Sequence, residues 1–168
     1  MAEGQGTKTS VTTLVHEIYI RATPQAIWDA ITKPEWTAKY GYGGLADYDL
    51  RPGGAFKGRT PPHLLSIGLP AVSVDGEVVE SDPPRKLVQT YRFLFNDATK
   101  AEGFTRLTWE IEPTQSGFSR LTVTHELEGA PIMASMVSGK FSEMGTGGWA
   151  WILSDLKTVL ETGAGMGA

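Results

Sequence analysis

The chain has 168 residues, a formal net charge of -4 and no cysteine. Its length and its 40% content of hydrophobic residues indicate one domain with a core of its own. The acidic balance argues against a nucleic-acid-binding surface, and the lack of cysteine excludes disulfides and thiolate metal sites. Residues 1–10 are polar and lack the apolar core of a signal peptide, so we expect a disordered lead and a cytoplasmic protein.

The first part of the chain predicts a strand followed by two helices. Residues 11–20 are rich in β-branched side chains and alternate imperfectly, which favours a strand. Thr23 can cap a helix in which Pro24 takes the first position. A second, shorter helix is predicted from Pro34 to about Tyr40.

From Tyr42 onward, strand patterns alternate with turn signals. The predicted strands are 47–51, 55–59, 77–81, 86–95, 105–112 and 119–127. Residues 60–70 indicate an irregular excursion with three prolines, 96–103 a polar loop, and 129–144 a weakly helical or looped segment. Because the strands follow one another through mostly short turns, we expect an antiparallel sheet.

The stretch 146–162 carries an apolar stripe at helical spacing. The stripe consists of Trp149, Ile152, Leu153, Leu156, Val159 and Leu160. Polar residues, including Asp155, fall on the other side, and Gly163 suits the end of a helix. A stripe of this length has to be buried, and the apolar face of the sheet is the available surface. The sequence therefore predicts an α+β fold.

Six segments in order carry a family resemblance. They are TPQAIWDAITKPEW (23–36), RPGGAF (51–56), DGEVVESDPPRKLVQTY (75–91), RLTWEIEP (106–113), RLTVTHE (120–126) and GGWAWILSDLKTVLETG (147–163). This set resembles the SRPBCC superfamily, and within it the Hsp90-ATPase-activator-like (Aha-type) START branch. The resemblance implies a helix-grip fold, in which a curved antiparallel sheet wraps the long C-terminal helix. It also implies a cavity between sheet and helix for an apolar or aromatic small molecule.

The resemblance sets the predicted domain limits as well. We expect a single START-like domain over 11–163 and a disordered tail over 164–168. Residues 60–74 form a longer segment than this branch leads us to expect. They could cover the cavity or lie outside it.

Three histidines, His16, His63 and His125, are the candidates for proton transfer or metal binding. None has a partner at ligand spacing, so we predict no metal site and no cofactor. His125 shares the inward face of its strand with Leu121 and Val123. This alternation leaves two interpretations: a hydrogen-bonded core histidine, or a catalytic acid or base that faces the cavity.

Large aromatic side chains and flexible methionines supply the candidate ligand contacts. Core packing explains most of them, and a ligand site would use those that cannot close against the helix. Three aromatic residues near the second helix lie where this fold usually has its cavity mouth. The predicted ligand-binding residues are Trp36, Tyr40, Tyr42, Phe56, Tyr91, Phe93, Trp109, His125, Met133, Met136, Trp149 and Leu153.

Three functions follow as alternatives, and the sequence leaves open whether any reaction is catalysed. The first is binding of a small apolar or aromatic molecule. The second is a cyclase- or hydratase-type enzyme that acts on a polyketide-like or aromatic substrate, with His125 as acid or base. The third is an Hsp90-activator-like module that binds protein.

The expected partners are correspondingly few. A small apolar molecule is the predicted ligand, and no nucleic acid is expected. We expect no membrane insertion, because the most apolar run, 64–74, is too short and too broken to span a bilayer. A homodimer is compatible with the sequence.

Overall fold

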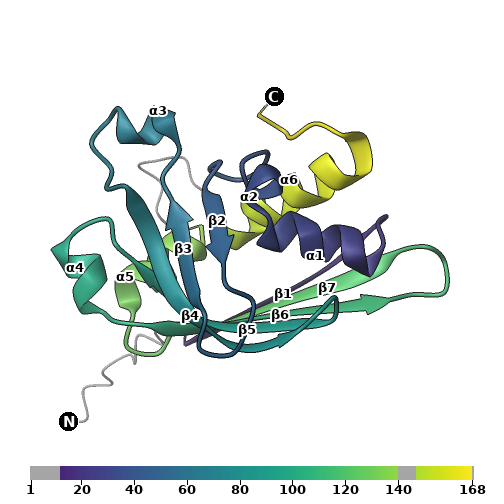
Figure 1. Cartoon of the computed structure of the whole chain (residues 1–168), viewed down its shortest axis with the longest axis horizontal. Helices are drawn as coiled ribbons and strands as arrows, with labels where there is room; N and C mark the ends of the chain where they lie inside the picture. The colour runs from purple at the N-terminus through teal and green to yellow at the C-terminus, as the bar shows by residue number, and fades with distance from the viewer. Residues whose placement is uncertain (1–11, 140–146, 168) are drawn as a thin grey trace, which may run out of the picture.

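A computed structural model of the chain describes residues 12–139 and 147–167. Within them, a seven-stranded antiparallel sheet in the order β1-β7-β6-β5-β4-β3-β2 curves around the helices (Figure 1). The predicted α+β helix-grip fold is thereby confirmed. The expected disordered lead, 1–10, and the part of the 129–144 segment from 140 onward lie outside the described residues.

The strands agree closely with the predicted ones. They are β1 (Thr13–Ile20), β2 (Leu45–Tyr48), β3 (Ala55–Arg59), β4 (Val72–Asp82), β5 (Lys86–Phe93), β6 (Thr105–Pro113) and β7 (Ser119–Glu126). The helices are α1 (Pro24–Thr32), α2 (Pro34–Thr37), α3 (Pro62–Leu65), α4 (Asp97–Ala101), α5 (Pro131–Val137) and α6 (Gly148–Thr162). The largest difference among the strands is β4, which begins five positions before the predicted 77–81 segment.

Two short helices lie in segments that the sequence predicted as irregular or looped. In α4, the side chain of Asn96 accepts a hydrogen bond from the Thr99 amide, and the Thr99 hydroxyl accepts one from the Asn96 amide. This is a capping box in which threonine replaces the usual glutamate or glutamine. Because the usual sequence signature is absent, the sequence did not predict this helix. The other, α3, lies in a loop whose two ends are hydrogen-bonded to each other, because the amide of Thr60 donates to the carbonyl of Ala71 at 2.9 Å.

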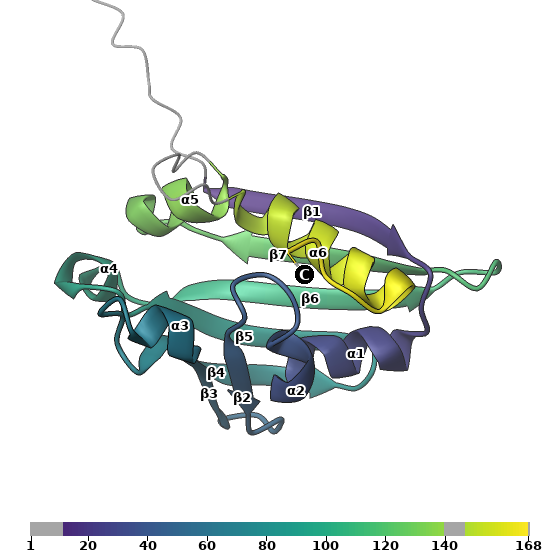
Figure 2. The same cartoon turned by 90° about the horizontal axis from the view of Figure 1, so that it is seen from above.

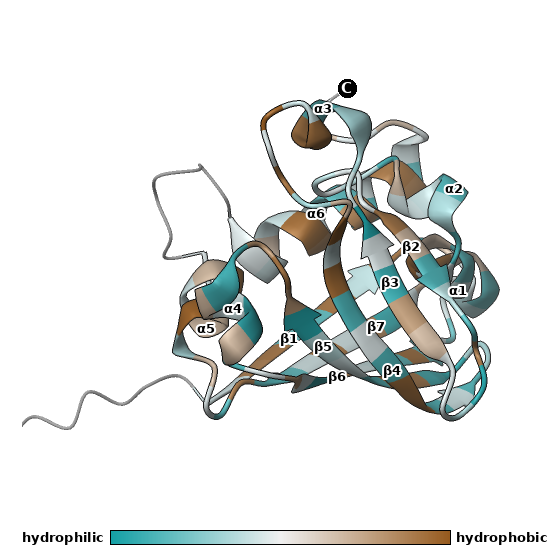
Figure 3. Cartoon of the chain, turned by 60° about the vertical axis from the view of Figure 1, so that its left-hand side comes forward, coloured by the Kyte–Doolittle hydropathy of each residue, from teal (hydrophilic) through white to brown (hydrophobic). Residues whose placement is uncertain are grey.

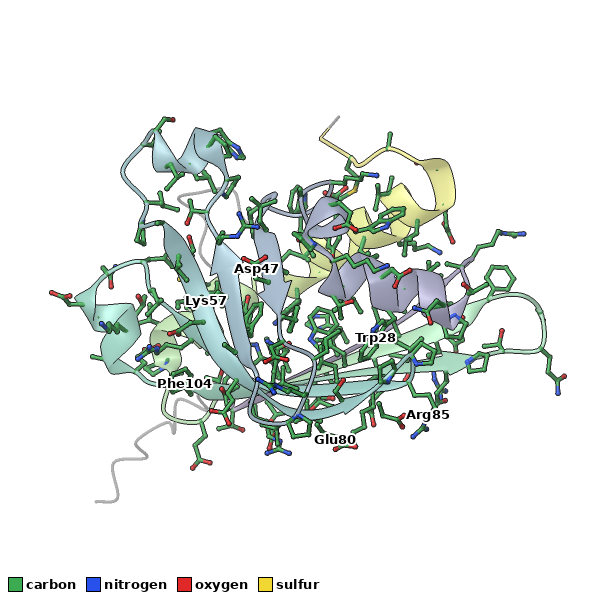
Figure 4. All side chains as sticks on the ribbon, viewed as in Figure 1. Trp28, Asp47, Lys57, Glu80, Arg85 and Phe104 are labelled. Carbon is green, nitrogen blue, oxygen red and sulfur yellow. The ribbon has the colours of Figure 1, made fainter. Side chains whose placement is uncertain are left out.

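Helices α1 and α6 lie side by side over the inner face of the sheet (Figure 2). The first begins as predicted, since the hydroxyl of Thr23 accepts a hydrogen bond from the amide of Ala26 at 3.1 Å. Trp28 extends from α1 into the space above the strands (Figure 4) and is buried there. The two helices together close most of the core.

The apolar stripe of α6 faces the core as expected, with Ile152 and Leu160 only partly buried, but Asp155 is a correction to the predicted polar side. Asp155 is 3% exposed, and its carboxylate accepts hydrogen bonds from the amides of Gly41 (2.8 Å) and Met166 (2.6 Å). Helical periodicity cannot reveal that a loop and the chain's end pack on the flank of a helix. Asp155 thus holds the loop after α2 and residues 164–167, which were expected to be disordered, against α6.

A glycine on β4 allows the backbone of β5 to approach closely, between two aromatic rings. Gly76 on β4 pairs with Phe56 on β3, and a Cβ added at Gly76 would collide with the carbonyl oxygen of Thr90. The rings of Phe56 on β3 and Tyr91 on β5 stack at a centroid distance of 6.0 Å on either side of this position. This close approach positions the aromatic residues of the candidate site.

Some of the exposed apolar side chains lie on a protruding segment of the chain. Figure 3 shows apolar residues on α3 and the loop that follows it, away from the core of the sheet. Leu65 and Ile67 are 44% and 66% exposed there. Among the described residues, no helix has the length and hydrophobicity that a membrane crossing requires.

The collision at Gly76 makes a direct prediction about stability. We expect Gly76→Ala to lower the free energy of unfolding by more than about 2 kcal/mol, because the methyl group must displace backbone. Chemical denaturation measures it. Gly44→Ala is the matched control, since its new Cβ meets nothing closer than the Arg59 carbonyl at 3.8 Å. Equal stability of the two variants would contradict this account of the close approach at Gly76.

Candidate functional site

His125 joins α6 to three strands through a chain of hydrogen bonds. It is fully buried on β7, and the indole Nε1 of Trp149 lies 3.1 Å from its Nδ1. Because an indole N–H can only donate, Nδ1 is the acceptor and Nε2 carries the ring proton. Nε2 then donates to the hydroxyl of Thr105 at 2.8 Å, and that hydroxyl donates to the carbonyl of Tyr91 at 2.7 Å.

This arrangement favours the interpretation of His125 as a hydrogen-bonded core residue. Burial lowers the pKa of His125 to about 3, so the ring is neutral near pH 7. Both ring nitrogens have protein partners, which leaves no lone pair or proton directed at a substrate. The predicted catalytic role of His125 therefore finds no support in its geometry.

A second buried polar side chain, Gln89 on β5, lies in the same row of the sheet. Leu107 on β6 separates it from His125. The Gln89 Oε1 atom accepts from the Tyr48 hydroxyl at 2.8 Å and from the Trp109 indole at 3.2 Å. Its Nε2 atom is buried and has no hydrogen-bond partner among the residues that the structure describes.

Four tyrosines, Tyr40, Tyr42, Tyr48 and Tyr91, lie on the loop after α2, on β2 and on β5, near enough for electrostatic effects to link them, and we call them the tyrosine cluster. Burial raises the pKa of Tyr40, Tyr48 and Tyr91, and neighbours within the cluster raise each of them further. The hydroxyls therefore stay protonated at neutral pH, as uncharged groups that can donate and accept hydrogen bonds. The Tyr40 hydroxyl donates a hydrogen bond to the carbonyl of Ala30 at 2.8 Å.

A series of ring contacts runs from β2 to α6 beside this cluster. Tyr48 stacks on Phe56 at 4.5 Å, and Phe56 stacks on Tyr91 at 6.0 Å. Tyr91 lies 6.3 Å from Trp149, which packs edge-on against Trp109 at 5.4 Å. The inner face along this series is thus aromatic, and its polar groups include tyrosine hydroxyls, Gln89, His125 and Thr105.

Two surface hollows reach the tyrosine cluster. The first, called the aromatic pocket, has a volume of about 370 Å³ and lies between the loop after α2, α3, α6 and residues 165–167. Tyr40, Tyr42, His63 and Trp151 line it, and Tyr42 stacks on Trp151 at 5.4 Å. Its inner wall is therefore shared with the tyrosine cluster.

The second hollow, called the polar cleft, has a volume of about 420 Å³ and lies between the α1–α2 junction and β2–β3. Tyr48 lines it together with Asp47 and Lys57, which face each other in the register of β2 and β3 (Figure 4). Its charged rim makes it a poorer entrance for an apolar molecule than the aromatic pocket.

The structure gathers most of the predicted site residues. Those in the ring series or next to it are Tyr40, Tyr42, Phe56, Tyr91, Phe93, Trp109, His125 and Trp149. Leu153 and Met133 are buried core residues, and the sulfur of Met133 lies 3.4 Å from the Thr105 hydroxyl. Met136 is only partly buried against the core, and Trp36 packs under the ammonium group of Lys39 at 4.4 Å.

Sequence reasoning missed Tyr48 and Gln89. For Gln89 a signal was present, because it alternates with Leu87 and Tyr91 along a predicted strand and so had to face inward. Tyr48 sat in a short segment whose register the sequence did not specify. Within the described ranges, no three acidic or histidine side chains are placed to hold a metal ion.

The buried neutral His125 predicts acid sensitivity. Its folded-state pKa, about 3, lies below the unfolded value near 6.5, so only the unfolded state takes up the proton between these values. Lowering the pH from 7 to 5 should therefore cost about 2 kcal/mol of folding free energy from this residue.

Urea denaturation of the wild type and of His125→Gln at both pH values measures that contribution. The variant should be less stable at pH 7 but should lose less stability on acidification. His16, whose pKa is also lowered by burial, is present in both proteins and cancels in the comparison. Identical losses in the two proteins would show that His125 is already charged, or exposed, in the folded state.

Solved structures of other proteins share the fold of this chain. A protein of Mesorhizobium loti is 20% identical, with 89% of this chain and 96% of that chain covered and a TM-score of 0.64. The Aha1 dimer of Colwellia psychrerythraea is 20% identical, with 91% and 98% covered and a TM-score of 0.60. An Hsp90 activator of Plasmodium falciparum is 22% identical, with 93% and 91% covered and a TM-score of 0.54.

These similarities concern the fold alone, and none of the curated proteins matches the chain in sequence. The family comparison is more specific. Residues 21–161 match the family described as Activator of Hsp90 ATPase homolog 1-like protein. As this match spans most of the chain, the protein belongs to that family, the Aha-type branch of the SRPBCC superfamily.

Proposed function

We propose that this protein binds a small ring-containing molecule between the curved sheet and α6, with the aromatic pocket as its entrance. The observation that carries the proposal is the tyrosine cluster. Its members come from the loop after α2, from β2 and from β5, and Tyr48 and Tyr91 belong to a continuous series of aromatic rings. Ligand sites in proteins typically combine such apolar walls with a few convergent polar groups.

The partial exposure of two residues of the cluster supports this proposal. Tyr48 and Tyr91 contact the buried core yet remain partly exposed, unlike Leu87 and Leu107 beside them, which are fully buried. Rings with residual accessible surface can gain contacts from a planar guest, and stacking on such rings is favourable. The uncharged hydroxyls would fix the guest's orientation.

The geometry favours binding over catalysis. A cyclase or hydratase needs a group that takes up or delivers a proton at neutral pH. His125 is neutral but fully engaged, and burial raises the pKa of the tyrosines. The aromatic interior can therefore hold and orient a molecule, whereas the groups described in it are poorly suited to move its protons.

Protein binding, self-association and cellular location stay predictions for this chain. The Colwellia neighbour is a dimer and the Plasmodium neighbour an Hsp90 activator, by description. A homodimer and an Hsp90-activator-like role are therefore worth testing by light scattering and by a binding assay with Hsp90. A cytoplasmic location rests on the sequence expectation alone.

Native mass spectrometry of freshly purified protein, together with calorimetric titration of 2-acetylnaphthalene, tests the proposed function. We expect a co-purifying small molecule, or binding of the probe to protein freed of it. Tyr91→Phe should weaken binding about tenfold, since it removes one buried hydrogen-bonding group from the cluster.

Tyr19→Phe is the matched control, because Tyr19 is 51% exposed on β1. It should bind the probe like the wild type. Protein that carries no small molecule and does not bind the probe would contradict the proposal.

A further inference from the structure

The orientation of the Gln89 side chain is fixed by its neighbours. The Trp109 indole can only donate, so the atom that it contacts at 3.2 Å has to be the amide oxygen. The Tyr48 hydroxyl, 2.8 Å away, donates to the same oxygen. Flipping the amide would therefore set its NH2 group against an indole N–H. The two N–H donors of Gln89 consequently point away from these partners.

These donors have no acceptor within the described protein. Gln89 is 0% exposed, and its Nε2 atom is buried without a hydrogen bond. Its neighbours across the sheet, Leu107 on β6 and Val78 on β4, are apolar and fully buried. A buried donor without a partner carries a free-energy cost, and such groups are rare in folded proteins.

The next inward residue along β5 is Tyr91 of the tyrosine cluster, and Tyr48 of the same cluster bonds to Gln89 directly. Both tyrosines are partly exposed, so the unpaired amide lies next to the surface that the guest is proposed to contact. A guest that enters past Tyr91 would therefore reach the unpaired Gln89 amide next along β5.

We propose that the Gln89 amide binds an acceptor oxygen of the ligand, which makes the preferred ligand class an uncharged ring compound with a carbonyl group. This inference rests on the proposed function and specifies its chemistry. A hydrocarbon would leave the amide unpaired. A carboxylate would bring a negative charge into a site of neutral tyrosine and glutamine side chains, where an unpaired charge is costly.

Two probes of the same shape test this selectivity. The first is 2-acetylnaphthalene, and the second is 2-isopropenylnaphthalene, in which a methylene group replaces the carbonyl oxygen. Calorimetry on the wild-type protein should show that the ketone binds about tenfold more tightly. Because the wild type supplies this ratio, the test does not depend on the folding of any variant.

Gln89→Met should abolish the preference by weakening ketone binding about tenfold while leaving binding of the alkene nearly unchanged. Gln115→Met makes the same chemical change in the exposed β6–β7 turn and should keep the preference. Circular dichroism establishes that each variant is folded.

The outcomes separate this inference from the proposed function. Equal affinities of the wild type for the two probes would overturn the role of Gln89 while leaving ligand binding intact. A preference that survives in folded Gln89→Met would overturn it as well. If the wild type binds neither probe although a small molecule co-purifies with it, this inference falls while the proposed function stands. If no small molecule co-purifies either, both fail.

Discussion

The hydrogen-bond chain from Trp149 through His125 and Thr105 to the carbonyl of Tyr91 is the interaction on which the rest of the structure depends. It connects α6 with β7, β6 and β5 through groups that are buried from water. Polar groups in such surroundings have to be paired, because the desolvation cost is otherwise not recovered. This hydrogen-bond chain therefore fixes the height and rotation of α6 above the sheet. Apolar packing alone would define the position of the helix less specifically.

The candidate site follows from that placement. Because Trp149 is hydrogen-bonded to His125, the Trp149 ring packs against the rings of Tyr91 and Trp109. The ring series continues from Tyr91 on β5 to Phe56 on β3, past Gly76 on the strand between them. At the opposite flank of α6, Asp155 holds the loop that carries Tyr40 and Tyr42. One helix thus positions both the aromatic wall and the entrance. Among the described residues, three buried side-chain polar atoms lack a hydrogen-bond partner: Gln89 Nε2, His16 Nδ1 and Ser81 Oγ. Of these, the amide of Gln89 is the one that lies beside the ring series, and we propose that it gives the interior its chemical preference.

Much of the fold could be predicted from the sequence, because it depends on periodicity and end signals. The Thr23 cap, the α6 stripe with Gly163 at its end, and the alternation in β6 and β7 all occur as expected. The candidate site was harder, since partners such as Tyr48 and Gln89 lie 41 positions apart and meet only through the sheet's register. The burial of Asp155 was not predicted for the same reason. Its partners are backbone amides from distant segments, and helical periodicity carries no information about such contacts.

A crystal structure of the protein with 2-acetylnaphthalene tests the central claim most directly. The account predicts that the probe lies between the sheet and α6 with its ring against Tyr91. Its carbonyl oxygen should lie about 2.9 Å from the Gln89 Nε2 atom. The account would be contradicted by a probe bound only in the polar cleft or elsewhere on the surface, with the interior aromatic rings packed as they are and the Gln89 amide bonded to a protein atom.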